Sequence, residues 1–364
     1  MDLVRQRLRH QRLIGALFTS PAATVRWFGA VQAQDFDGAL WAVGLRTKGA
    51  THAAVEQALT DRVIVRSWPL RGTLHFVAAD DLRWMLATLA PRIVAGTTRR
   101  LTAVELDART LTRCRRIVER SLEGGRQLER RALYQRLESA GVRTAQSRGM
   151  HILWWLAHHG VICFGARDGN QHRFALVDDW LPPSRRLDRD EALAELARRY
   201  FVSHGPAKAD DFRWWSGLDA ASARSALEIA RPRLRRSVVE GDVYWSGEPV
   251  SADGSAAALR SPHATLLPPY DEYLVAYRDR SAALDPVHAS ATRNGIFAPI
   301  VVINGKVAGT WARTERRDSV AVTTRLLTRP TASESLAVAA AVERYRAFKR
   351  PASAALPPDS RAIR

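Results

Sequence analysis

Helices followed by a short β-hairpin recur three times along this chain. In the clearest copy, residues 127–180, two amphipathic helices (LERRALYQRLESAG and SRGMHILWWLAHHG) end at Gly141 and Gly160. Two short strands (VICFG and HRFALV) then flank Asp168-Gly169, a strong hairpin signal. This order of elements is typical of the winged helix-turn-helix, so we expect one here.

Two further copies and two regions of different character complete the chain. A copy over 187–248 has three predicted helices and a hairpin, and a less regular copy begins the chain. Near the C-terminus, Asn304-Gly305 predicts another hairpin, and a further strand (SVAVTTRLL) and a final amphipathic helix follow it. We therefore predict a helix-rich α+β fold with small wings, divided as follows: winged helix 1 (1–80), helical connector (81–126), winged helix 2 (127–180), winged helix 3 (187–248), C-terminal β-hairpin and helix region (260–350) and a loose tail (351–364).

The charge balance indicates a polyanionic partner. Lysine and arginine total 55 against 37 aspartate and glutamate residues, a formal net charge of +18. Basic proteins bind nucleic acid because neutralising phosphates releases condensed counterions. A membrane surface is the competing partner, but no stretch is apolar and long enough to cross a bilayer.

The termini and the cysteines bear on the compartment. The arginine-rich N-terminus lacks a secretory signal, and is compatible with an organelle presequence or with a first packed helix. Cys114 and Cys163 match no metal-binding spacing and are compatible with a reducing compartment. We expect a cytoplasmic, nucleoid-associated protein without a metal or another cofactor, since the sequence also has no glycine-rich phosphate loop.

Three winged helices on one chain favour binding by shape and phosphate contacts over the reading of base edges. They could form a curved basic surface around one DNA duplex. The sequence shows no dimerisation coiled coil, so we expect a monomer. A non-enzymatic regulator, which would bind a palindromic site as a dimer, is the main alternative, and an RNA-binding protein is a weaker one.

The stretch VQAQDFD stands out within the first copy. In an extended chain residues i and i+2 point to the same side, so Gln32 and Gln34 would converge on one spot. On a helix they would point roughly 200° apart. The alternative is a helix end and loop in which both amides are solvated.

Several motifs together resemble one family, and the resemblance extends over about residues 3–348. They are VQAQD, WPLRGTLH, GPAKADDFRWWSGL, LLPPYDEYLVAYRDR and the hairpin GKVAGTW. The chain resembles the AlkZ/YcaQ family of bacterial winged-helix DNA glycosylases, whose founding type protects the producer of a DNA-crosslinking natural product. The catalytic Gln-apolar-Gln motif of that family falls on Gln32, Ala33 and Gln34.

The resemblance implies a monofunctional DNA glycosylase acting on alkylated, and possibly crosslinked, bases in duplex DNA. A glutamine amide does not titrate, but it can hold a water molecule and stabilise a sugar cation. It therefore suits an already cationic leaving group, such as an N7- or N3-alkylpurine. Asp35 or Asp37 could instead be the base. The lysine nearest to the motif in sequence is Lys48, which argues against a Schiff base.

Other residues in these motifs are candidate DNA contacts. His75 could line the lesion pocket or be an ordinary strand histidine, and Asp271 and Glu272 could be structural, pairing with arginines. We expect the tryptophans at 154, 155, 214 and 215 to pack in cores. The predicted DNA-binding residues are Arg71, Thr73, His75, Arg278, Arg280, Lys306, Trp311 and Arg313.

Overall fold

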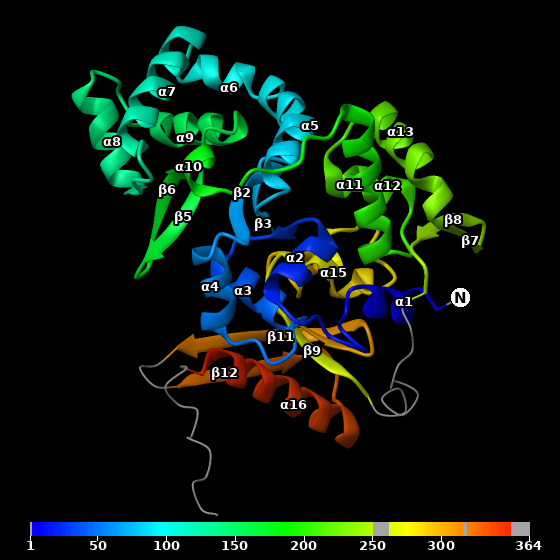
Figure 1. Ribbon diagram of the computed structural model, residues 1–364. Helices are drawn as coiled ribbons and strands as arrows, with labels where there is room; N and C mark the ends of the chain where they lie inside the picture. The colour runs from blue at the N-terminus through cyan, green and yellow to red at the C-terminus, as the bar shows by residue number, and fades with distance from the viewer. Residues whose placement is uncertain (1, 250–261, 316–318, 351–364) are drawn as a thin grey trace, which may run out of the picture.

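The computed structural model describes residues 2–249, 262–315 and 319–350 (Figure 1). The N-terminal unit begins with a separate helix, α1. A short strand, β1, then lies in the chain between the next two helices, α2 and α3. Its sheet has the order β1-β3-β2, with β3 antiparallel to both neighbours. Its elements are α1 (Leu3–His10), α2 (Pro21–Phe28), β1 (Val31–Gln32), α3 (Phe36–Gly44), α4 (His52–Thr60), β2 (Ile64–Leu70) and β3 (Thr73–Ala78).

The second unit repeats this arrangement, with sheet order β4-β6-β5. Helix α7 belongs to the predicted connector, yet its apolar side shares one hydrophobic cluster with α8 and α9. The core of this unit therefore begins well before residue 127. The elements are α5 (Leu82–Ala95), α6 (Thr98–Ala103), α7 (Ala108–Leu122), β4 (Leu128–Glu129), α8 (Arg130–Ser139), α9 (Arg148–His158), β5 (Ile162–Asp168), β6 (Gln171–Leu176) and α10 (Val177–Trp180).

The third unit has three helices followed by a two-stranded sheet. Asp188 and Glu191 form a capping box that begins its first helix. The backbone of Ala207 pairs with Trp245, at the place that β1 and β4 occupy in the other two units. Its elements are α11 (Arg189–His204), α12 (Ala209–Ser216), α13 (Ala220–Ala230), η1 (Arg231–Arg233), β7 (Arg235–Val239) and β8 (Asp242–Ser246).

The C-terminal region forms a four-stranded antiparallel sheet, β12-β11-β10-β9, larger than the predicted hairpin. Asn304 and Gly305 both have positive φ, as the hairpin signal predicted. The predicted loose tail, 351–364, lies outside the described residues. The elements are β9 (Ala264–Leu267), α15 (Glu272–Val275), η2 (Pro286–His288), η3 (Arg293–Gly295), β10 (Ile300–Ile303), β11 (Lys306–Glu315), β12 (Val320–Leu326) and α16 (Ala332–Lys349).

The N-terminal unit is the centre of the molecule. Figure 1 shows the second and third units above it and the C-terminal sheet with α16 below it. One hydrophobic cluster joins the N-terminal unit to the C-terminal sheet, and another joins it to the third unit. The short helix α15 lies at this centre, so residues about 240 positions apart in sequence can meet there. Among the described residues, no helix is long and apolar enough to cross a membrane.

Candidate active site

The Gln32–Gln34 segment runs along the outer edge of β3 toward the tip of the β2–β3 hairpin. Gln32 pairs with His75 across the sheet, and the amide of Ala33 donates to the carbonyl of Leu74 at 2.7 Å. The predicted extended conformation therefore holds at Gln32. Both glutamine side chains point to the β2–β3 hairpin, Gln32 to Arg71 and Gln34 to the amide of Leu74; their convergence on one spot stays a prediction.

The two glutamines differ in exposure. Gln32 is only 7% exposed, and its Oε1 accepts a hydrogen bond from Nη2 of Arg71 at 2.9 Å. Gln34 is exposed, and its Oε1 accepts from the amide of Leu74 at 3.3 Å. A carbonyl oxygen has two lone pairs, so each amide can accept one more hydrogen bond. Gln34 is the member of the pair that solvent reaches.

Arg71 and Gly72 form the two-residue tip of this hairpin. Leu70 pairs with Thr73, and both tip residues have positive φ, 52° and 70°, as a type I′ turn requires. This turn directs the Arg71 side chain inward, where Nη1 donates to the carbonyl of Trp215. The guanidinium thus donates to protein groups and holds Gln32. Arg71 also lines the cleft described below, and its predicted phosphate contact stays a prediction.

Arg66 binds the residue between the two glutamines. Its Nε and Nη2 donate to the carbonyl of Ala33 at 3.1 and 2.8 Å. Ala33 is fully buried, so its small side chain fits a closed position in the core. Burial, then the charge of Arg167, lowers the pKa of Arg66 to about 10, and it stays protonated at neutral pH.

A buried carboxylate, Glu272, lies directly behind the motif. Its Oε1 accepts from the amide of Gln32 at 2.8 Å. Its Oε2 accepts from Nε1 of Trp215 at 3.0 Å and from Nε2 of His204 at 3.3 Å. Burial alone would raise the pKa of Glu272, but the hydrogen bond and charge of His204, with smaller contributions from His75 and Gln32, lower it overall. The group is therefore an anion at neutral pH.

The two alternative bases lie outside the cleft described below. Asp37 pairs with His52 at 3.2 Å and with Arg313 at 3.5 Å. The hydrogen bond from His52 is the main cause that lowers the pKa of Asp37 to about 2. Asp35 occupies the N-cap position of α3, and its Oδ2 lies 2.6 Å from the place that a Cβ on Gly38 would take. Asp37 is thus a weak base held by other partners, which argues against the alternative that it is the catalytic base.

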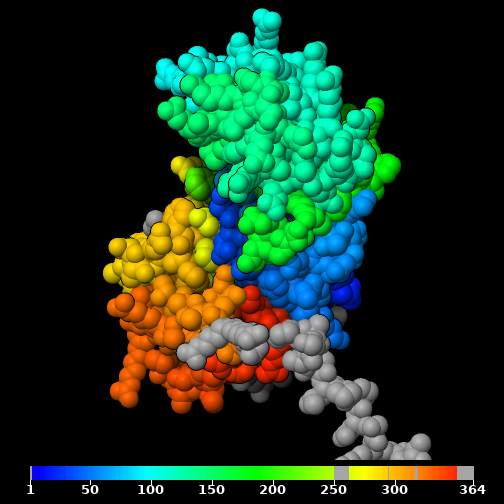
Figure 2. All heavy atoms as spheres, turned by 90° about the vertical axis from the view of Figure 1, so that its left-hand side faces the viewer, coloured from blue at the N-terminus to red at the C-terminus, as the bar shows by residue number. Residues whose placement is uncertain are grey.

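A cleft of about 1440 Å³ separates the hairpin tip from the second unit. Figure 2 shows the molecular surface hollowed below the second unit, with dark-blue N-terminal atoms at the floor. One acidic residue, Glu129, lies among its described lining residues, so the cleft is strongly basic. The hairpin contributes Trp68, Gly72 and Thr73, and Gln34 lies beside it. The arginines that line the cleft are Arg66, Arg71, Arg92, Arg100, Arg130 and Arg131.

Two predicted DNA contacts are buried, which corrects their assignment. His75 is fully buried, because it faces the core of the sheet, and its Nδ1 lies 2.9 Å from the carbonyl of Thr73. Burial, then the charge of Arg71, lowers its pKa to about 3, so it is neutral. Trp311 is 4% exposed, donates from Nε1 to the carbonyl of Leu267 and packs on Tyr345.

The remaining predicted contacts lie away from the cleft, apart from Thr73. Arg278 is exposed and pairs with Asp210 at 2.9 Å. Arg280 donates to the carbonyl of Leu274, and Lys306 donates to the carbonyl of Ala282 at 2.7 Å. The structure does not bring these residues together with the glutamines. Arg313 pairs with Asp37 of α3 at 3.5 Å and is not among the described residues that line the cleft.

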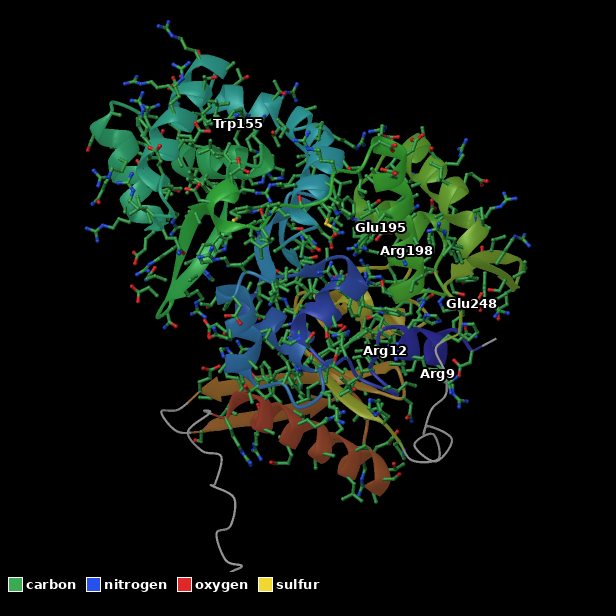
Figure 3. All side chains as sticks on the ribbon, viewed as in Figure 1. Arg9, Arg12, Trp155, Glu195, Arg198 and Glu248 are labelled. Carbon is green, nitrogen blue, oxygen red and sulfur yellow. The ribbon has the colours of Figure 1, made fainter. Side chains whose placement is uncertain are left out.

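The tryptophans expected in cores divide into two groups. Trp215 is fully buried, and Trp155, labelled in Figure 3, packs against the core of the second unit and stacks on His159. The prediction is wrong for Trp214, which is 43% exposed. Trp154 lines the cleft, and its Nε1 lies 3.4 Å from the carbonyl of Gly72.

Sequence reasoning did not identify Arg66, His204 or Glu272 as part of the site. A charged residue at a buried position of a predicted strand is a usable signal for Arg66. Glu272 was considered only as a structural partner of an arginine, a role that Asp271 fulfils with Arg46 at 2.8 Å. No three His, Cys, Asp or Glu side chains within the described ranges are grouped so that they could hold a metal ion.

Comparison with known proteins identifies the family. A family model described as "DNA glycosylase AlkZ-like" matches residues 25–348. The chain belongs to this family. A curated relative from Streptomyces sahachiroi, the "Interstrand DNA cross-link repair glycosylase", is 26% identical over 332 residues, covering 80% of this chain and 82% of the relative. The predicted membership and the prediction of a DNA glycosylase enzyme are confirmed.

A solved structure supports the fold of this AlkZ-like chain. It is the "Streptomyces sahachiroi DNA glycosylase AlkZ", with a TM-score of 0.76 and 23% identity. The similarity covers 96% of this chain and 97% of that chain. The predicted mixed fold of helices and small sheets is thus confirmed across nearly the whole length.

Proposed function

We propose that this chain hydrolyses the N-glycosidic bond of N7- or N3-alkylated purines in duplex DNA, bulky and crosslinked adducts included. The observation that carries the proposal is the position of Gln34 and Gln32 at a hairpin tip that faces a basic cleft. The curated relative is named for the repair of interstrand DNA cross-links, which supports the crosslinked substrate class.

DNA binding follows from the units and the cleft they enclose. Each of the three units orders its helices and hairpin as a winged helix does, and we propose that each is one. Arg100, Arg130 and Arg131 are exposed in the cleft and can contact phosphates. Arginine binds phosphate in a bidentate manner, which positions the duplex without reading its sequence.

The chemistry uses neutral amides beside a fixed anion. An N7- or N3-alkylpurine is cationic in the substrate, so its departure needs no proton donor. Gln34, the exposed amide, holds the attacking water through its carbonyl oxygen, while Gln32, whose backbone amide is anchored by Glu272, stabilises the positive charge that develops on the sugar. No lysine lies among the described residues that line the cleft, so hydrolysis by water is favoured over a Schiff base.

Base release from damaged duplex tests this proposal. We would compare the wild type with Gln34→Ala and with Gln32→Ala/Gln34→Ala on duplexes carrying N7-methylguanine or a nitrogen-mustard crosslink. Removal of a well-placed polar group commonly costs about 100-fold or more in the chemical step, and we expect such a loss with duplex affinity kept. Gln57→Ala is the matched control, because Gln57 is an exposed amide of the same unit outside the cleft.

Each outcome decides between specific alternatives. Equal release by the wild type and the double variant would clear the glutamines and return attention to Asp35. No release from either lesion, together with tight binding to undamaged duplex, would favour the binding-only regulator. A monomeric state and a cytoplasmic location remain predictions, which sedimentation of the purified chain and fractionation of cells would test.

A further inference from the structure

Four segments far apart in sequence close a ring of hydrogen bonds behind the candidate catalytic glutamines. Glu272 accepts from the amide of Gln32, whose side-chain oxygen accepts from Arg71. Arg71 donates to the carbonyl of Trp215, and the indole of Trp215 donates back to Glu272. The ring joins β1, the β2–β3 tip, α12 and α15. Removing one member therefore affects the two residues that contact it directly.

Glu272 is the anion of this ring. Its carboxylate faces N–H donors from Gln32, Trp215 and His204, and it is 2% exposed. A buried carboxylate is tolerated only when such donors and positive charge compensate for its lost hydration. Arg71 supplies the nearby positive charge: burial lowers its pKa, and the charge of Glu272 opposes that shift.

We propose that Glu272 is a positioning residue for base release, which anchors the backbone amide of Gln32 and so holds its side chain in the working orientation. The inference rests on the proposed function and names a residue that acts through Gln32. Glu272 does not line the cleft among the residues described, so it reaches the substrate only through its partners. Loss of its charge should therefore slow the chemical step and leave duplex binding nearly unchanged.

Glu272→Gln is the variant that isolates this role. A glutamine has the same length, but it offers one acceptor and one N–H₂ donor where three N–H donors converge. At least one donor, from Gln32 or from Trp215, then meets another donor. Arg71 also loses its nearby anion. In the orientation that turns the N–H₂ group toward Gln32, Gln32 loses its backbone anchor; in the other, Trp215 loses its acceptor and the ring opens there.

Asp81→Asn is the matched control. Asp81 is also a buried carboxylate that accepts an indole N–H, from Trp84, and an arginine, Arg199. It occupies the N-cap position of α5. Among the described residues, Asp81 contacts none of the four ring members. The two variants share the general cost of neutralising a buried carboxylate, so a difference in catalysis is specific to the ring.

Single-turnover base release at saturating enzyme measures the chemical step apart from binding. At a temperature where both variants remain folded by circular dichroism, we expect Glu272→Gln to lower the rate constant about 10- to 100-fold. We expect the dissociation constant for the lesion duplex to change less than about threefold, and Asp81→Asn to keep the wild-type rate constant. Equal rate constants for Glu272→Gln and the wild type would overturn the proposal.

A double-mutant cycle separates positioning from a general structural defect. If Glu272 acts through Gln32, Gln32→Ala/Glu272→Gln should be about as slow as Gln32→Ala alone. Independent effects would instead multiply the two losses, and that result would overturn the proposal even if Glu272→Gln is slow. Absence of base release by the wild type is a different outcome, because it would refute the proposed function itself.

Discussion

Neutralising Asp271 tests whether the centre of the molecule depends on one buried ion pair. Asp271 makes two hydrogen bonds with the guanidinium of Arg46, at 2.8 and 2.9 Å, and both side chains are 2% exposed. Asp271→Asn keeps the shape of the side chain and removes its charge. Arg46 then remains as a buried cation without its counter-charge, although the carbonyls of Gln11 and Ala42 still accept from it.

The expected cost follows from burial. Removing one partner of a buried pair destabilises a protein by about 3–5 kcal/mol, because the remaining charge stays desolvated. Unfolding entropy of about 2.1 cal/mol/K per residue gives roughly 0.8 kcal/mol/K for 364 residues. The melting temperature should therefore fall by roughly 4–7 °C if the chain unfolds as one unit.

Differential scanning calorimetry at pH 7 measures this shift. Asp80→Asn is the control, because Asp80 forms a 2.8 Å pair with Arg26 in which both side chains are more than two-fifths exposed. Such pairs contribute about 0–1 kcal/mol, so we expect a shift of about 1 °C or less. Similar shifts for the two variants would show that burial does not increase the contribution of the Asp271–Arg46 pair to the free energy of unfolding.

Three further predictions concern pH and salt. The rate of base release should be independent of pH between 5 and 8, since glutamine does not titrate and the pKa values of Asp37 (about 2) and His75 (about 3) lie below that range. A rate that changes tenfold within this range would contradict the assignment of the glutamines as the catalytic groups. The free energy of unfolding should fall between pH 6 and 5, because burial holds the pKa of His75 near 3 and that of His158 near 4, so the unfolded chain binds more protons there. The slope should be about 1.4 kcal/mol per pH unit for each histidine, and urea unfolding of His158→Gln should show a smaller one. Fluorescence anisotropy at several salt concentrations gives the slope of log Kd against log salt concentration for duplex binding. Arg130→Ala/Arg131→Ala should reduce this slope by about two if both side chains contact phosphates. An unchanged slope would show that the duplex does not contact these two arginines.

The periodic pattern of the sequence predicted the elements well, because each depends on neighbouring residues. The hairpin expected at Asn304-Gly305 forms with these two residues as its tip, since they accept the backbone conformations of a tight turn. The hairpin expected at Asp168-Gly169 also forms, but Asp168 pairs with Gln171, so its tip is Gly169 and Asn170. The boundary near residue 127 was less well placed. Helix α7 joins the second unit through apolar contacts between residues far apart in the chain, which local patterns do not contain.

The candidate site shows the same division between local and distant information. The spacing of Gln32 and Gln34 predicted that their side chains point to one side, and both accept hydrogen bonds from residues of the β2–β3 hairpin. Arg71 was expected to contact phosphates; it lines the cleft, and its hydrogen bonds to Gln32 and Trp215 were not indicated by the sequence. Trp311 was expected in a groove, but α16 covers its face of the sheet.

The sequence by itself determined the helices, the hairpins, the basic charge and the residues of the glutamine motif. These follow from periodicity, turn chemistry and composition, which are properties of short stretches or of sums over the chain. The tertiary structure alone decided which charged groups surround the motif. Glu272 lies 240 positions from Gln32 in sequence, and only the packing of α15 against the N-terminal unit brings its carboxylate within 2.8 Å of the Gln32 amide.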